Sequence, residues 1–170
     1  MNKKVNRSGT VSIVAGLYAF LTYFSAFLGL AYGAVQFRLS ESLMILAAHN
    51  PYMIAGLTLG CLLGNLTSTL GPFDILVGTA ATFLSAVCIY FICKRIKKAV
   101  LRTVITTLVT ALFNAVLIGL EISLILNEGF LITAVSVAVG EIAVCGVLSY
   151  PLEKTVIKIP LLKNFFMKRS

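Results

Sequence analysis

Long apolar runs constrain this chain more than any other feature. Each run is close to the ~20 residues that a helix needs to cross the hydrocarbon core of a bilayer. Of the 170 residues, 59% are hydrophobic and only 12% are charged, whereas a soluble domain of this size needs more polar surface. We therefore predict one all-α integral membrane domain over the whole chain. The apolar runs are 11–32, 42–66, 73–93, 103–126 and 130–150.

The basic residues are sorted along the chain in a way that predicts its orientation. All Lys and Arg residues except Arg38 fall into three clusters that flank apolar runs. The positive-inside rule assigns such clusters to the cytoplasm, so the net charge of +8 does not indicate a nucleic-acid partner. The clusters are Lys3, Lys4 and Arg7; Lys94, Arg95, Lys97, Lys98 and Arg102; and Lys154, Lys158, Lys163, Lys168 and Arg169.

The pair Asn50-Pro51 interrupts the second apolar run, which is either one kinked helix or two short helices joined by a turn. Only an even number of spans brings all three basic clusters to the cytoplasmic side. We therefore predict six transmembrane helices with both termini cytoplasmic. The second helix is short, so it must tilt or lie beside a thinned or water-filled region. The predicted helices are 10–32, 39–49, 51–67, 73–93, 100–126 and 130–150, followed by a basic cytoplasmic tail over 151–170.

Several polar side chains lie within or beside the predicted spans. An ionisable group at membrane depth costs roughly 2.5–3.5 kcal/mol, so those that remain usually face a cavity or a partner. Most of them fall near the three connections expected outside the cell, which are 33–40, 67–72 and 127–129. We therefore predict a substrate pocket that opens outward. Its candidate residues are Gln36, Arg38, Glu41, Asn65, Asp74, Asn114, Glu121 and Glu141.

Plainer roles stay open for some of these residues. Arg38 and Glu41 are three positions apart and suitably spaced to pair on the surface. Asp74 is expected in the first turn of a helix, where the helix dipole favours a carboxylate. Asn65 and Asn114 are also typical of hydrogen bonds between helices.

Glu121 and Glu141 are the strongest candidates, because each lies in an apolar helix without a nearby Lys or Arg. A carboxylate can accept two adjacent N–H groups from a guanine-like edge, and it also attracts a cationic amine. Aromatic residues near the mouth can stack on a flat base, although an interfacial belt is their commoner role. These aromatic residues are Tyr32, Phe37, Phe73 and Phe130.

Other sites are not indicated by the sequence. The single histidine, His49, has no obvious partner, and the four cysteines form no Cys-x-x-Cys pair, so we expect no metal site. We find no nucleophile–base pair and no nucleotide-binding loop, and we expect neither enzymatic activity nor a cofactor. Ala15 and Ala19 lie one turn apart on the first helix, a spacing that lets another helix approach closely.

The polar residues belong to a series of short blocks that resembles the queuosine-precursor transporter family. Members of this family are the substrate-binding S components of energy-coupling-factor (ECF) transporters, and the resemblance runs over about 11–151. The blocks are VQFRLSE at 35–41, NPY at 50–52, GLTLGC at 56–61, LGPFD at 70–74, GTAAT at 78–82, GLE at 119–121 and GE at 140–141.

The resemblance implies a six-helix S component in a bacterial cell membrane. Such a protein binds a deazaguanine base from outside, associates with a transmembrane coupling subunit and two cytoplasmic ATPases, and topples to release its substrate. Ala15 and Ala19 match the family's motif for docking on the coupling subunit. The eight polar candidates fall on recurring polar positions of the pattern, whereas His49 departs from it.

We expect Glu121, Glu141 and Glu41 to hold the base edge or an amine, with Asn65 and Asn114 orienting the ligand. We expect Arg38 to order the first external connection. An S component for another vitamin or for tryptophan is the nearest alternative. An ion-coupled carrier or channel, a membrane enzyme and a structural membrane subunit are alternatives of other classes.

Overall fold

The computed structural model describes residues 7–31, 36–68 and 70–167. Four of the helices in this part of the chain, α1, α3, α4 and α5, are long and apolar enough to cross a membrane, as expected of a multi-pass membrane protein. The helices are α1 (Arg7–Phe27), the 3₁₀ helix η1 (Leu39–Ala48), α2 (Tyr52–Asn65), α3 (Pro72–Cys93), α4 (Ala99–Leu126), α5 (Phe130–Lys158) and α6 (Pro160–Phe166).

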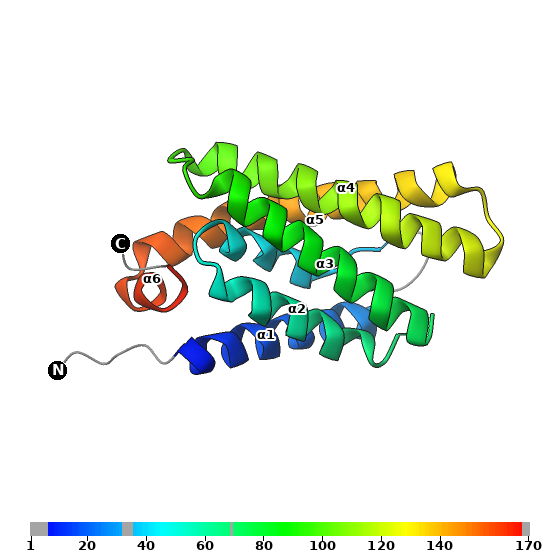
Figure 1. The fold of residues 1–170 in the computed structure, drawn as a ribbon, viewed down its shortest axis with the longest axis horizontal. Helices are drawn as coiled ribbons and strands as arrows, with labels where there is room; N and C mark the ends of the chain where they lie inside the picture. Colours follow the sequence, from blue (N-terminus) through cyan, green and yellow to red (C-terminus); the bar gives the residue numbers. More distant parts are fainter. Residues whose placement is uncertain (1–6, 32–35, 69, 168–170) are drawn as a thin grey trace.

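Consecutive helices run back and forth along one elongated bundle (Figure 1). The start of α1, the turn after η1, the α3–α4 loop and the end of α5 share one end, which also carries Arg7, Lys98 and Lys158. We call it the basic end, and the other the opposite end. The two short segments expected at 39–49 and 51–67 are both present, but η1 and α2 fall below the length of a full span.

The first helix ends five residues earlier than the predicted 32, because a glycine turn stops it after Phe27. Gly29 has a φ of 72°, the left-handed conformation that commonly terminates helices. The N–H of Gly29 bonds to the carbonyl of Ala26 at 2.9 Å, and that of Leu30 to the carbonyl of Ser25 at 2.9 Å. Tyr32 and residues 33–35 of the first external connection lie outside the described residues, as do Lys3, Lys4, Lys168 and Arg169.

The last long helix differs most from the prediction, which ended it at 150 and began a tail at 151. Here α5 continues through Pro151 to Lys158. The proline lacks an N–H donor and cannot bond to the carbonyl of Val147, four residues earlier, so packing must offset a cost of about 3 kcal/mol. Val156 and, in α6, Phe166 are buried in the main apolar core, so burial keeps this segment on the bundle.

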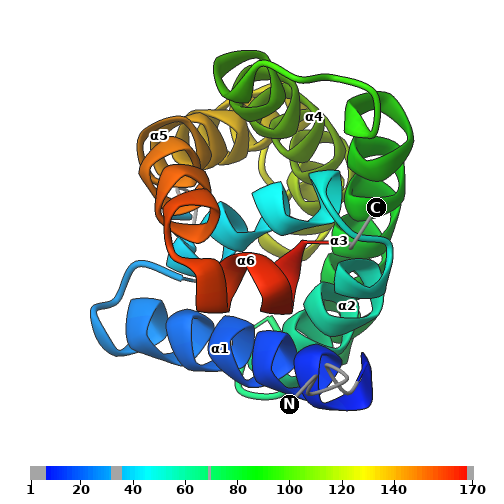
Figure 2. The same cartoon turned by 90° about the vertical axis from the view of Figure 1, so that its left-hand side faces the viewer.

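The 3₁₀ helix η1 forms the centre of the bundle. Figure 2 looks onto the basic end and shows η1 surrounded by α1 to α5, with α6 in front of it. Every residue of η1 except Leu39 is buried, and Leu43, Met44 and Ile45 belong to the main apolar core. A central segment this apolar is stabilised by the helices around it rather than by its own hydrogen bonds.

Close packing of α1 on α2 depends on glycines spaced one turn apart in α2. A Cβ on Gly56 would lie 2.9 Å from Cβ of Val14, and one on Gly60 would lie 2.6 Å from Cβ of Tyr18 and 2.9 Å from the carbonyl of Ala15. Small residues at this spacing allow two helix backbones to approach.

The two predicted docking residues, Ala15 and Ala19, are therefore buried, at 5% and 7% exposure, on the face of α1 that α2 contacts. The outward face of α1 presents Leu17, Phe20 and Gly16 instead, and no atom lies within 4 Å of a Cβ built on Gly16. The assignment of Ala15 and Ala19 to docking stays a prediction.

Candidate functional site

Arg38 is the centre of a buried polar cluster at the opposite end of the bundle. Its Nη2 donates to both carboxylate oxygens of Asp74, at 3.1 and 3.2 Å, and its Nη1 donates to Oδ1 of Asn65 at 3.2 Å. Nδ2 of Asn65 donates in turn to the carbonyl of Asp74 at 2.9 Å. All three side chains are buried, and a buried ion pair of this kind needs such additional hydrogen bonds. The cluster fastens the start of η1 to α2 and α3.

Local sequence explains why Asn65 and Asp74 meet. Gly71 has a φ of 79° and turns the chain, and Pro72 then occupies the first turn of α3, which suits a residue without an N–H donor. Asp74 lies in that first turn, as predicted, but its carboxylate is taken by Arg38. A Cβ on Gly78, one turn further on, would collide with Nδ2 of Asn65.

Glu41 is directed toward α1 and does not form the surface pair with Arg38 that their spacing allowed. The hydroxyl of Tyr18 donates to Oε1 of Glu41, and the hydroxyls of Tyr18 and Thr82 are 3.5 Å apart. Glu41 and Tyr18 are both fully buried. Oε2 of Glu41 has no hydrogen-bond partner among the described residues.

Glu141 belongs to a third group, which joins α4 to α5. Nδ2 of Asn114 donates to its Oε1 at 2.9 Å, and Sγ of Cys145 lies 3.8 Å from its Oε2. Sγ of Cys145 also donates to the backbone carbonyl of Glu41 at 3.4 Å, which brings this group into contact with η1.

Glu121 differs from the other carboxylates because both of its oxygens are buried and lack a hydrogen-bond partner in the described part of the chain. It lies on α4 where Gly119 packs on α5: a Cβ on Gly119 would lie 2.7 Å from Cα of Ala134. The hydroxyl of Thr133 donates to the carbonyl of Gly119 at 2.7 Å and closes the same contact. Close packing thus fixes the position of Glu121.

Gln36 places an amide donor beside the same helices. A Cβ on Gly140 of α5 would collide with the carbonyl oxygen of Gln36, so glycine at 140 makes room for this segment. The side chain is buried, and its Nε2 has no partner among the described residues.

The three groups form one electrostatic unit. Glu121 interacts with both Asp74 and Arg38, and Glu141 interacts with Glu41 and Arg38. In the described chain this unit contains four carboxylates and one guanidinium group. Its unpartnered atoms are both oxygens of Glu121, Oε2 of Glu41 and Nε2 of Gln36. The arrangement is chemically suited to a ligand that carries several N–H donors, one acceptor and a positive charge.

All eight polar residues predicted for the site are buried in the structure. Hydrogen bonds or charge interactions link seven of them, and Gln36 packs on Gly140 beside Glu141. Their role in ligand binding stays a prediction.

Two of the aromatic residues predicted near the mouth are exposed instead. Phe73 is 67% exposed and Phe130 is 39% exposed, which suits an interfacial belt. Sequence reasoning missed Tyr18 and Cys145. The available signal was weak, because a tyrosine and a cysteine within apolar runs are normally core residues.

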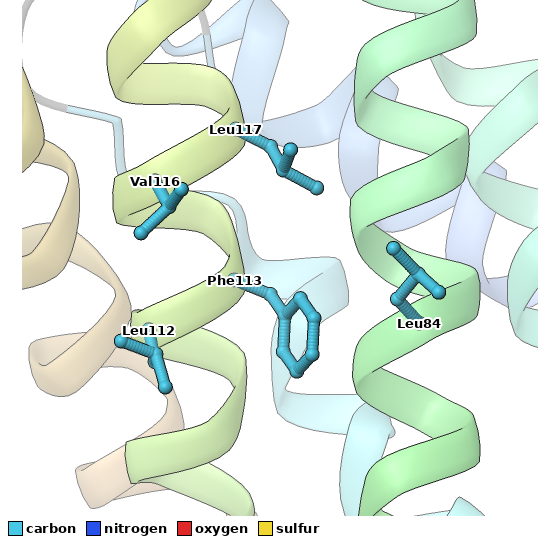
Figure 3. A pocket seen from close by; sticks show the side chains of 5 residues that line it. All are labelled: Leu84, Leu112, Phe113, Val116 and Leu117. Carbon is cyan, nitrogen blue, oxygen red and sulfur yellow. The ribbon is translucent and has the colours of Figure 1, made fainter.

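A crevice elsewhere on the bundle is a different feature of the molecule. It has a volume of about 320 Å³ and lies between α3 and α4, lined by Leu84, Leu112, Phe113, Val116 and Leu117 (Figure 3). Its lining is entirely apolar, and Leu112 is 62% exposed on the outside of the bundle. It offers nothing to a polar ligand.

No group of three or more His, Cys, Asp or Glu side chains suited to a metal ion occurs in the described residues. His49, which had no obvious partner in the sequence, has its Nε2 at 2.8 Å from Oε1 of Glu153.

An all-helical bundle with four helices long enough to span a membrane and a buried polar unit at one end is the architecture of a multi-pass membrane protein. The chain belongs to the QueT transporter family, whose model matches residues 10–158. It is 38% identical over 84 residues to the queuosine precursor transporter QueT of Lactococcus lactis subsp. cremoris (strain MG1363). That alignment covers 48% of this chain and 49% of the relative, so the two match over about half of their lengths. No solved structure matches the chain.

Proposed function

We propose that this protein is the substrate-binding S component of an ECF importer and captures a deazaguanine precursor of queuosine. The name of the Lactococcus relative supports the substrate, and the family supports transport. The observation that carries the proposal is the buried polar unit around Arg38, in which Glu121 has two unpartnered oxygens.

The unpartnered atoms match the hydrogen-bonding groups of a deazaguanine. Glu121 can accept the two adjacent N–H groups of the base edge, as carboxylates do with guanine-like edges. Nε2 of Gln36 can donate to the base carbonyl, and Oε2 of Glu41 can accept from an amine on the seven-position tail. A cationic amine would also offset the excess of carboxylates over Arg38, which lowers the cost of burying them.

The orientation follows from charge. Under the positive-inside rule the basic end, with Arg7, Lys98 and Lys158, faces the cytoplasm. The polar unit then faces outward, where an importer must capture its substrate. We accordingly propose six passes, with η1 and α2 as short ones and both termini cytoplasmic.

Energy would come from partners, because the sequence has no nucleotide-binding loop. We propose a transmembrane coupling subunit and two cytoplasmic ATPases. The coupling subunit would dock on α1, whose outward face presents Gly16 as a point of close approach. Docking at Ala15 and Ala19, as the family motif suggests, would require α2, which contacts α1 through Gly60, to move away from α1.

The test is a binding measurement on the detergent-purified protein with a deazaguanine that carries an aminomethyl tail, guanine, and a set of vitamins. A ligand that binds only the folded state stabilises it by about 2.7 kcal/mol at a hundredfold excess over Kd, which raises the thermal midpoint. We expect a shift with the deazaguanine and little with guanine. A shift with a vitamin alone would retain the S-component role and reject the substrate. Binding of none of these compounds by folded protein would reject the proposal.

A further inference from the structure

One stripe of polar side chains on α5 contacts the central helix η1 along its length. The stripe consists of Glu141, Cys145, Ser149 and Glu153, spaced four residues apart and all buried. Residues at this spacing share one face of an α-helix. Sγ of Cys145 donates to the carbonyl of Glu41 at 3.4 Å, and Oγ of Ser149 donates to the carbonyl of Ser42 at 3.1 Å.

Glu153, the last member of the stripe, holds the C-terminal end of η1, which lies at the basic end of the bundle. Its Oε1 lies 2.8 Å from Nε2 of His49, directly after η1, and 2.5 Å from Nε of Arg102 at the start of α4. Nη1 of Arg102 donates to the carbonyls of Ile96 and Lys97 in the α3–α4 loop, at 2.6 and 3.1 Å. One carboxylate therefore connects η1 to the loop, α4 and α5.

The N-terminal end of η1 lies in the polar unit, where Arg38 and Glu41 are fixed by Asp74 and Tyr18. Since a 3₁₀ helix rises about 2.0 Å per residue, ten residues separate the two ends by roughly 20 Å. The same short helix thus begins in the candidate binding site and ends in the cluster of His49, Arg102 and Glu153.

The 3₁₀ conformation of η1 means that a change at one end of the helix can move its other end. It has ten residues, whereas 3₁₀ runs beyond three or four are uncommon because their hydrogen bonds are poorly aligned. Its surroundings must hold it in this form. Relaxation to an α-helix would shorten it by about 0.5 Å per residue, or about 5 Å in all. If release of the C-terminal end allowed this shortening, Arg38 and Glu41 at the N-terminal end would be displaced.

We propose that Glu153 is a positioning residue for the binding site. By fixing the C-terminal end of η1 to Arg102 and α5, it holds Arg38 and Glu41 in their binding geometry. This proposal rests on the proposed function only in naming the ligand. The relation is reciprocal by linkage, so ligand binding at the opposite end strengthens the cluster at the basic end.

The first test compares Glu153→Gln with Lys158→Gln, an exposed charge one turn further along α5. Deazaguanine affinity is measured by calorimetry on the full chain. We expect Glu153→Gln to raise Kd about tenfold and Lys158→Gln to leave it unchanged. Ser149→Ala, a milder change in the same stripe, is expected to raise Kd about fivefold or less. Unchanged Kd in Glu153→Gln and Ser149→Ala, with a lower thermal midpoint, would reduce the stripe to a structural role and overturn the proposal.

The second test needs no ligand and separates the two proposals. Amide hydrogen exchange is followed by mass spectrometry in unliganded wild type and in both variants at 153 and 158. Glu153→Gln should speed exchange over 38–43, at the far end of η1, as well as near His49. Faster exchange confined to the segment around 149–158 would overturn the coupling. If wild type binds no deazaguanine, the proposed function fails, and the exchange data alone decide the role of Glu153.

Discussion

The two ends of this bundle bury charge in different ways. At the basic end, Oε1 of Glu153 contacts both Arg102 and His49, so one carboxylate has two basic side chains as partners. At the opposite end, the polar unit holds four carboxylates and one guanidinium group, Arg38, which forms its ion pair with Asp74. Both oxygens of Glu121 have no partner in the described chain. The charge at one end is balanced by the protein, and at the other it is not.

This difference teaches where to look for a ligand. A buried carboxylate without a partner costs free energy, and in a folded protein that cost usually reflects a function. Paired groups hold helices together, whereas unpaired ones are available to an incoming molecule. Within the opposite end itself, Arg38 and Asp74 belong to the first kind and Glu121 to the second. Substitutions can separate the two kinds.

The largest effect is expected from Asp74→Asn, which removes the charge that balances Arg38. Breaking a buried ion pair from one side typically costs 3–5 kcal/mol, because the other charge stays buried and uncompensated. Thermal unfolding in detergent should show a large drop in the midpoint. Glu128→Gln, an exposed substitution in the α4–α5 loop, is the matched control and should leave the midpoint unchanged. A small effect of Asp74→Asn would mean that Arg38 is not held by this pair.

The next effect, on binding rather than stability, is expected from Glu121→Gln. Removing two charge-assisted hydrogen bonds to a ligand should weaken deazaguanine binding about a hundredfold or more. Stability should stay the same or rise, because an unpaired buried charge is removed. Calorimetry and thermal unfolding of the same sample measure both quantities. A variant that binds normally, or that unfolds as easily as Asp74→Asn, would place Glu121 among the structural charges.

Much of this contrast was predictable from sequence because it depends on charge. Carboxylates within apolar runs are conspicuous, so Glu121 and Glu141 were identified without knowing their neighbours. Their partners were not predictable, because hydrogen-bond partners depend on three-dimensional contacts across the bundle. Spacing along the chain suggested that Arg38 would pair with Glu41, whereas the fold brings Arg38 to Asp74, 36 positions away.

The starts of α2 and α3 were predicted from local chemistry, whereas the end of α5, which packing decides, was missed. The sequence located the breaks before α2 and α3, each marked by a proline, to within a residue or so. It ended the last helix at 150 because Pro151 and the basic residues that follow resemble a tail. The burial of Glu153 and Val156 against the bundle keeps α5 helical to Lys158, and this burial is invisible in the sequence.

A smaller effect is expected where α1 meets α2, a contact that positions Tyr18 beside Glu41. Gly60→Ala would place a Cβ 2.6 Å from Cβ of Tyr18, and overpacking of this kind typically costs about 1–3 kcal/mol. Thermal unfolding should show the loss, with weaker deazaguanine binding because Tyr18 shifts. Gly16→Ala on the outward face of α1 is the matched control: its Cβ meets no atom within 4 Å, so stability should hold or rise slightly. Equal effects of the two substitutions would contradict the close α1–α2 contact.

The smallest effect is expected from Asn114→Ala, which tests whether Glu141 belongs with the paired or the unpaired charges. The substitution removes one hydrogen bond between α4 and α5, and such bonds in membrane proteins are worth about 0.6 kcal/mol on average. If Glu141 is a structural charge, thermal unfolding should show this small loss and the affinity for deazaguanine should not change. If Glu141 acts on the ligand, as the sequence analysis predicts, its carboxylate loses the hydrogen bond that orients it, and Kd should rise severalfold. Leu112→Ala, on the outer side of the same helix, controls for loss of side-chain volume at a position 62% exposed.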